Sequence, residues 1–153
     1  MEGGEGKAER GRVTVENRQA AIPLEESLVE ALSAAGTRAL ALIIERGLLL
    51  GEVIVGAAVF LVDDAEIGRV HGDYFDDPSP TDVITFPLGN YGEILVGVET
   101  ARRQAGEFGA EFDRELALYV VHGVLHLCGY EDQSEAGRVR MAELQDAIVA
   151  EVY

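Results

Sequence analysis

Two histidines four residues apart, His122 and His126, are the residues of this sequence best suited to chemistry. They lie in an apolar stretch whose pattern predicts a helix, and residues four apart share a helical face. Both imidazoles can therefore point at one spot, as in a two-histidine metal site. Gly129 follows where a helix ends with a left-handed residue, so the chain can turn Asp132 back toward that spot. The sequence predicts a metal site formed by His122, His126 and Asp132.

The spacing H-x-x-x-H-x-x-G-x-x-D matches the zinc frame H-E-x-x-H-x-x-G-x-x-H of metalloproteases, with two differences. Asp132 replaces the third histidine, and an aspartate oxygen is an acceptable zinc ligand that leaves one position for water. Gly123 replaces the glutamate that serves such proteases as general base, so peptide hydrolysis is disfavoured. Asp132 can instead cap the next helix, in which case Glu131 and Gln133 are rival ligands and His71 is the reserve candidate.

The bulk composition restricts the class of protein. The 153 residues, 48% of them hydrophobic, indicate one globular domain over 11–153 after a Gly/Glu-rich tail, 1–10, predicted to be disordered. The single cysteine, Cys128, excludes a disulfide framework and is expected to be a buried structural thiol. No signal-peptide pattern is present, and Glu45 and Arg46 interrupt the longest apolar run. We therefore expect a cytoplasmic protein with no membrane span.

The net charge of −16 is unusual, because 28 acidic residues face 12 basic ones and Lys7 is the sole lysine. Nucleic-acid binding draws mainly on lysine and arginine, so such a chain should repel phosphates overall. A polyanionic substrate would need a local arginine patch, a metal or a partner. Adaptation to a salt-rich cytoplasm, where repulsion between charges is screened, is an alternative explanation for the acidity.

The hydrophobic pattern predicts the element order β-α-β-α-β-β-α-α-α. The predicted strands cover residues 13–17, 54–62, 81–86 and 93–98. The predicted helices run from Pro23 to about Arg46, from a cap at Asp63 to Phe75, from Thr100 to Phe108, from a cap at Asp113, and from a cap at Ser134. This order is typical of an α/β (α+β) domain with a mixed four-stranded sheet and helices packed on it. The helix with the two histidines is apolar nearly all round, so it should be the central, buried one.

Three stretches resemble the YbeY family of bacterial rRNA maturation factors, which are zinc-dependent endoribonucleases. PTDVITFP at 80–87 is similar to the family's P-T-D-V-[LI]-[ST]-F-P segment. The residues from GEILVGV to HGVLHLCGYED, at 92–132, are similar to its following strand, helix and histidine helix. The M-x-x-x-[EQ] pattern at 141–145 is similar to its C-terminal pattern. The resemblance spans about 50–149, and HGVLHLCGY is its most specific part.

By this resemblance, His122, His126 and Asp132 occupy the family's three metal-ligand positions, and one Zn²⁺ per chain is implied. Two imidazoles and a carboxylate also suit iron, nickel or manganese. The family's motif usually ends in Asp-His, where this chain has Glu131 followed by Asp132. The arginine that the family carries before P-T-D-V is replaced by Phe75, which removes a candidate phosphate contact.

The resemblance implies a metal-dependent, single-strand-specific endoribonuclease in 16S rRNA 3′-end maturation and ribosome quality control. Its partners would be rRNA, the small ribosomal subunit and ribosome-associated proteins. With Gly123 in the glutamate position the base is unassigned, and the nucleophile is either a metal-bound water or the RNA 2′-hydroxyl. Asp82 either orients a histidine or closes the preceding proline turn. Arg102, Arg103 and Arg114 are either phosphate contacts or solvated surface.

Two other functions are compatible with the same residues. A non-catalytic ribosome-assembly or protein-binding factor with a structural metal would suit the acidic surface and the missing arginine. A metallohydrolase that acts on small molecules or peptides is the third hypothesis.

Overall fold

The computed structural model describes residues 11–153, so the tail predicted at 1–10 lies outside the described residues. Over the described part of the chain, helices and strands follow one another in the predicted order. The strands are β1 (Arg12–Asn17), β2 (Gly56–Val62), β3 (Val83–Pro87) and β4 (Tyr91–Gly97). The helices are α1 (Glu26–Glu45), α2 (Asp64–Phe75), α3 (Val98–Phe108), α4 (Phe112–Leu127) and α5 (Glu135–Val152).

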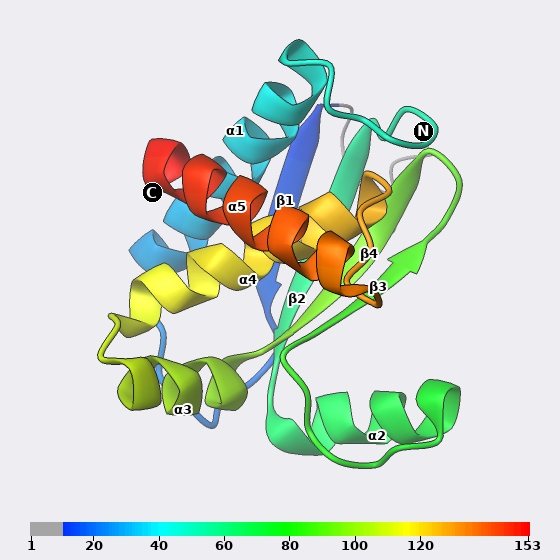
Figure 1. Ribbon diagram of the computed structural model, residues 1–153. Helices are drawn as coiled ribbons and strands as arrows, with labels where there is room; N and C mark the ends of the chain where they lie inside the picture. The colour runs from blue at the N-terminus through cyan, green and yellow to red at the C-terminus, as the bar shows by residue number, and fades with distance from the viewer. Residues whose placement is uncertain (1–10) are drawn as a thin grey trace, which may run out of the picture.

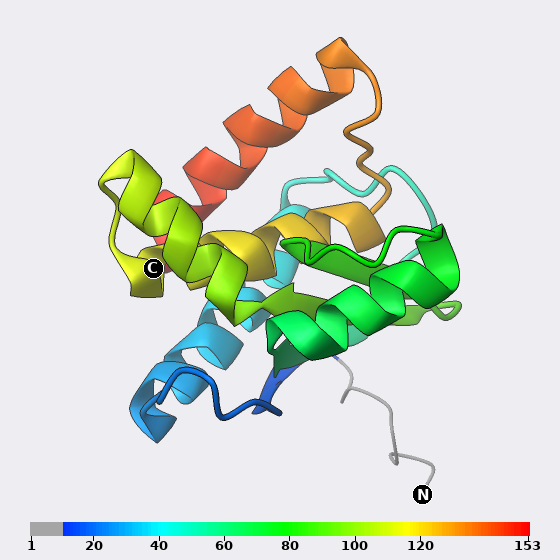
Figure 2. The same cartoon turned by 90° about the horizontal axis from the view of Figure 1, so that it is seen from below.

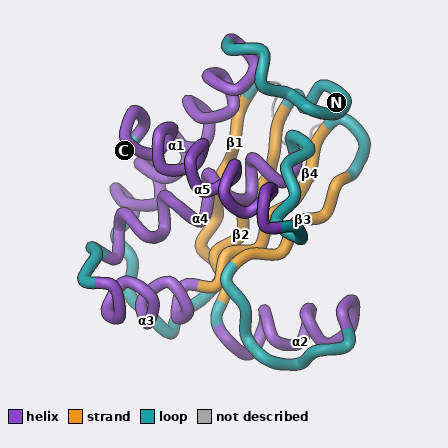
Figure 3. Tube along the Cα trace, viewed as in Figure 1, coloured by secondary structure: helices purple, strands orange, loops and turns teal. Residues whose placement is uncertain are grey.

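The strands form one mixed sheet in the order β1-β2-β4-β3 (Figure 1). β1 and β4 run parallel to β2, whereas β3 pairs with β4 in the antiparallel direction. In Figure 3, helices α1, α4 and α5 gather along one side of the strands, and α2 lies apart from them. The predicted fold class, a mixed four-stranded sheet with helices packed on it, is confirmed.

Each face of the sheet has its own apolar cluster, because successive strand residues point to opposite faces. Val59 and Ile94 are partners across β2 and β4 and belong to the large core formed with α1 and α4. Phe60 and Leu95, the next partners, pack in a smaller cluster with Ile67 of α2. Figure 2 shows α2 across the strands from α1. The sheet therefore separates a thick helical layer from the single helix α2.

α4 is a helix with many buried residues. It contacts α1, α3, α5 and the strands β3 and β4. Gly123 of α4 lies so close to β4 that an added Cβ atom would be 2.6 Å from Cγ2 of Ile94. The glycine at the position of the protease glutamate is thus required by packing of the helix on the sheet.

The start of α1 differs from the prediction. The helix begins at Glu26 and not at Pro23, because the first helical amides, those of Leu28 and Val29, donate hydrogen bonds to the carbonyl of Glu25. Pro23 therefore lies in the segment that precedes the helix. The predicted end is confirmed, since Gly47 adopts a left-handed φ of 66° just after the last turn.

The predicted cap of α4 is also wrong. The helix begins at Phe112, so Asp113 lies inside its first turn, where a carboxylate interacts favourably with the positive end of the helix dipole. The other two predicted caps are confirmed. The side chain of Asp63 accepts a hydrogen bond from the amide of Glu66, and that of Ser134 accepts one from the amide of Gly137.

Helix α1 is long and apolar enough, with a mean hydropathy of 1.5, to cross a membrane by length and composition alone. It buries Leu32, Ala39, Leu40 and Ile43 in the main core, against β1, α4 and α5. One face of α1 thus packs as part of the core of the domain.

Candidate metal centre

His122, His126 and Asp132 come together where α4 ends and the next loop turns back. Nε2 of His126 lies 3.1 Å from Nε2 of His122, and Oδ2 of Asp132 lies 3.6 Å and 3.5 Å from Nε2 of His122 and His126. A tetrahedral zinc ion about 2.0–2.1 Å from nitrogen or oxygen ligands holds them about 3.3 Å from one another. The spacing of the three atoms therefore fits a small tetrahedral cation.

Hydrogen bonds to the other ring nitrogens determine which nitrogen faces this cluster. Nδ1 of His122 donates to Oε1 of Gln145 at 2.7 Å, and Nδ1 of His126 donates to the backbone carbonyl of Tyr130 at 2.9 Å. Because both acceptors are oxygens, the ring protons lie on Nδ1 and both Nε2 atoms present lone pairs. Two lone pairs and the oxygen of Asp132 repel one another at these distances. A cation between them removes the repulsion, so the cluster can hold a metal ion.

The protonation state of His126 also favours metal binding. Burial lowers the pKa of His126, and His122 lowers it further, against the opposing effects of the Tyr130 carbonyl and Asp132. A lowered pKa keeps the imidazole neutral at pH values below its usual 6.5, and neutral imidazole is the form that binds metals.

We expect the metal-free protein to lose stability as the pH falls below 6.5, the usual pKa of histidine. In this range the unfolded chain takes up a proton at His126 that the folded chain resists, so acid favours unfolding. Urea denaturation in chelator at pH 7.5 and 5.5 measures the effect. His126→Gln should show a smaller difference between the two pH values, and an equal difference would contradict the assignment.

Gln145 is a site residue that the metal-ligand pattern did not reveal. It lies half-buried on α5, 23 residues from the histidine it orients. Its sequence signal was the M-x-x-x-[EQ] pattern at 141–145, whose last position it occupies. The hydrogen bond shows why an amide or carboxylate oxygen is useful at that position, since such an oxygen accepts the Nδ1 proton of His122.

Gln145→Ala should lower the affinity for zinc by about 10- to 100-fold, because outer partners of metal-binding histidines have effects of this size. Competition with a chromogenic chelator measures the change. The control is Glu143→Ala, an exposed position on the same helix, which should bind zinc as the wild type does. Equal affinities in the two variants would show that the hydrogen bond does not support the site.

The loop between α4 and Asp132 is held by Gly129 and Tyr130. Gly129 adopts a φ of 108°, the predicted left-handed stop, and a Cβ atom there would lie 2.9 Å from Cβ of Leu50. The hydroxyl of Tyr130 donates to the carbonyl of Leu48 at 2.8 Å, which ties the loop to the segment after α1. The backbone that orients His126 is thus anchored to a distant part of the chain.

Glu131, one of the two rival third ligands, has another role, and the thiol of Cys128 is buried. Glu131 accepts hydrogen bonds from the amides of Gln133 and Ser134 and from the hydroxyl of Ser134, and the bonds from Ser134 are the main cause of its lowered pKa. Its carboxylate therefore shapes the turn into α5. Cys128 is buried, as predicted, and burial raises the pKa of its thiol to about 12. Such a thiol is protonated and inert at neutral pH.

A cleft of about 410 Å³ opens beside the cluster. Its walls come from α2, the start of β3, α4 and the loop after α4, and include His71, Phe75, Asp82, His122, His126 and Asp132. The reserve candidate His71 thus shares the cleft but is not one of the three grouped ligand residues. Nδ1 of His71 lies 2.9 Å from the carbonyl of Ser79, which fixes the orientation of its ring.

Asp82 lines the cleft but orients neither histidine. Its carboxylate accepts hydrogen bonds from the amide of Val83 at 2.7 Å and from the hydroxyl of Thr81 at 3.3 Å. Gln145 and the carbonyl of Tyr130 supply the orienting contacts instead. The hydrogen bonds of Asp82 are thus local to the start of β3.

Arg102, Arg103 and Arg114, the weak candidates for phosphate contacts, do not line the cleft. Arg103 pairs with Asp64 at 2.9 Å, and this hydrogen-bonded pairing raises the pKa of Arg103. Arg102 and Arg114 are exposed on α3 and α4. Among the described residues that line the cleft, none is a lysine or an arginine.

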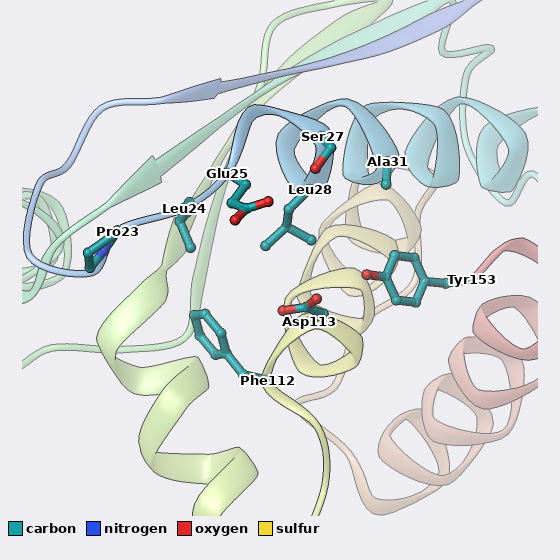
Figure 4. A pocket seen from close by; sticks show the side chains of 9 residues that line it. All are labelled: Pro23, Leu24, Glu25, Ser27, Leu28, Ala31, Phe112, Asp113 and Tyr153. Carbon is teal, nitrogen blue, oxygen red and sulfur yellow. The ribbon is translucent and has the colours of Figure 1, made fainter.

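A second hollow, of about 400 Å³, lies between the segment before α1, the start of α4 and the last residue (Figure 4). Leu24, Leu28, Phe112 and Tyr153 form much of its wall, and Figure 4 shows Asp113 on α4 among them. It shares no lining residue with the cleft and holds no histidine. The three candidate ligands therefore line the cleft beside α4 and not this hollow.

A mixed α/β fold whose central helix carries a His-x-x-x-His pair, with an aspartate returning to it, defines a class of proteins with a candidate one-metal site. The family model Endoribonuclease YbeY matches residues 15–153. Its members include Endoribonuclease YbeY of Moorella thermoacetica, 36% identical over 91% of this chain and 96% of that protein. The protein of the same name from Pelotomaculum thermopropionicum is 34% identical over 90% and 94%. The chain belongs to the YbeY family.

The fold supports this membership. The solution structure of a protein from Thermotoga maritima is similar with a TM-score of 0.60 and 30% sequence identity. The similarity covers 92% of this chain and 88% of that one. The resemblance noted in the sequence is thereby confirmed.

Proposed function

We propose that this protein is a metal-dependent endoribonuclease that cleaves single-stranded RNA in 16S rRNA 3′-end maturation and ribosome quality control. The observation that carries the proposal is the convergence of two Nε2 lone pairs and a carboxylate oxygen on one wall of an open cleft. Relatives over nearly the whole chain are named endoribonucleases, which supports RNA as the substrate. The proposal includes one Zn²⁺ per chain, a cytoplasmic location, rRNA and the small subunit as partners, and a single domain over 11–153.

His122, His126 and Asp132 would hold the ion, which when bound would act as a Lewis acid on the scissile phosphodiester. Gln145 and the Tyr130 carbonyl keep the ring protons on Nδ1, so both Nε2 atoms remain available as ligands. The two imidazoles and the carboxylate are partly buried, and their exposed edges face the cleft where a phosphate would bind.

The shape and charge of the cleft favour single strands. An A-form duplex presents its base edges and phosphates over a wide surface, whereas an unstacked nucleotide can enter a cleft of about 410 Å³. With no lysine or arginine among the described cleft residues, the bound metal would be the cation that attracts the phosphate. RNA binding should therefore depend strongly on the metal.

The test is cleavage of a single-stranded oligoribonucleotide that carries the 16S rRNA 3′-end sequence, with the same sequence in a duplex as control. We expect cleavage of the single strand, loss of cleavage in chelator, and recovery on addition of zinc. Cleavage that survives chelation would contradict the metal mechanism.

The non-catalytic binding factor is the second candidate, because the described cleft residues include no cation to bind phosphate. Co-sedimentation with ribosomes without cleavage of any RNA would favour it. Activity on peptides alone would favour the third hypothesis, a metallohydrolase of another class.

A further inference from the structure

Phe75 places an exposed aromatic ring in the cleft that contains the candidate metal centre. It is 56% exposed and is the last residue of α2. Its ring centroid lies 5.7 Å from that of His71, with an angle of 53° between the ring planes. The two rings approach the cleft from α2, whereas His122 and His126 approach it from α4.

The end of α2 holds Phe75 in this exposed position. Asp76 adopts a left-handed φ of 59° and its amide donates to the carbonyl of Gly72, so the helix ends directly after the phenylalanine. The following loop packs closely on the helix, because a Cβ atom on Gly68 would lie 2.7 Å from the carbonyl oxygen of Pro78. The packed end of α2 thus presents an apolar ring to the cleft, and a ligand that covered it would remove apolar surface from water.

The charge around the ring restricts the ligand. Asp76 and Asp77 follow Phe75 directly in the chain, and Asp82 and Asp132 line the same cleft. A phosphate placed on the ring would meet these carboxylates without a compensating lysine or arginine among the described cleft residues. The flat face of a nucleobase is uncharged, and aromatic rings stack on such faces whatever the base.

We propose that Phe75, with His71 beside it, is a stacking platform for one unpaired nucleobase of the RNA substrate. This inference rests on the proposed endoribonuclease function and gives the substrate an orientation, with its base toward α2 and its phosphate toward α4. A base in a duplex already has both faces stacked, so the platform selects nucleotides that are free to leave the stack. Selection for single strands is then a property of α2, separate from the metal ligands.

Tryptophan fluorescence tests the platform without any need for cleavage. The sequence contains no tryptophan, so Phe75→Trp creates a sole reporter in the cleft. Phe108→Trp is the matched control, because Phe108 is 73% exposed at the end of α3 and does not line the cleft. Each zinc-loaded variant is titrated with a single-stranded 2′-O-methyl oligoribonucleotide. The titration is then repeated with the same oligonucleotide made abasic. We expect the intact strand, but not the abasic strand, to quench the tryptophan fluorescence of Phe75→Trp. Neither strand should quench the fluorescence of Phe108→Trp.

Binding and kinetics provide the second measurement. Phe75→Leu should raise the KM for single-stranded RNA by about 5- to 150-fold, the size expected for loss of one stacked base. Phe75→Tyr should have a KM close to that of the wild type, because the ring is retained. Phe108→Leu should leave KM unchanged. Equal KM values for wild type and Phe75→Leu, or equal quenching by intact and abasic strands, would overturn the platform.

The outcomes separate the platform from the proposed function. Cleavage of RNA by the wild type, with no quenching of Phe75→Trp, would refute the platform and leave the endoribonuclease standing. Quenching of Phe75→Trp without cleavage would support the platform in a protein that only binds RNA. Failure of both measurements would refute both.

Discussion

Replacement of His126 by alanine is expected to lower the affinity for zinc by at least about a hundredfold and the rate of RNA cleavage by about a thousandfold. The substitution removes one of three converging ligand atoms and leaves the other two without a complete site. A Lewis-acid metal contributes several kcal/mol to such reactions, and each 1.36 kcal/mol is a factor of about ten in rate. Competition with a chromogenic chelator measures the zinc affinity, elemental analysis measures the zinc content, and cleavage of a single-stranded oligoribonucleotide measures the rate.

His71→Ala is the matched control, since His71 is a histidine in the same cleft that lies outside the cluster. It should keep about one zinc ion per chain, the stoichiometry of a single three-ligand site. Asp132→Ala should lose zinc as His126→Ala does. A full complement of zinc in His126→Ala, or its loss in His71→Ala, would place the metal elsewhere.

Gly123→Glu, which would restore the glutamate of the metalloprotease frame, is expected to destabilise the protein by more than about 4 kcal/mol. Overpacking against Cγ2 of Ile94 costs about 1–3 kcal/mol. A carboxylate without a partner at this buried position adds a further penalty. The total is a large part of the roughly 5–15 kcal/mol that stabilises a domain. Packing as well as chemistry thus separates this chain from the protease frame.

Urea denaturation measures the effect, with Gly106→Glu as the control. Gly106 is also a helical glycine, on α3, but it is exposed and an added Cβ atom would meet nothing within 4 Å. Its substitution should be neutral or stabilising by up to about 1 kcal/mol, because glycine is a poor helix former. Similar unfolding midpoints for the two variants would contradict the packing explanation of Gly123.

The features that the sequence predicted well are those set by short-range spacing. His126 follows His122 by four positions and Gly129 follows His126 by three, so a single helical turn and its stop determine their relative positions. Ser134 caps α5 through the amide three residues later, which is also a local pattern. The start of α4 was misplaced because Asp113 suits the first turn of a helix as well as its cap.

The features that were missed depend on contacts between distant parts of the chain. Nothing in the local sequence indicates that Gln145 reaches His122, or that Tyr130 is tied to Leu48 across 82 residues. Residues of α2 and α4 line one cleft together with the start of β3, and this arrangement also depends on how the helices pack on the sheet. His71 and Phe75 could be named as candidates, but their place beside the cluster follows from tertiary packing.

The short span of the three candidate ligands has a thermodynamic consequence. His122, His126 and Asp132 lie within a segment of ten peptide bonds, so closing a loop around an ion costs the unfolded chain little entropy. An ion that also binds the unfolded chain stabilises the fold only by the difference between its two affinities. That difference is set by Gln145 and Tyr130, which align the ligands in the folded state alone. Removal of the metal by a chelator should therefore abolish activity while the protein remains folded.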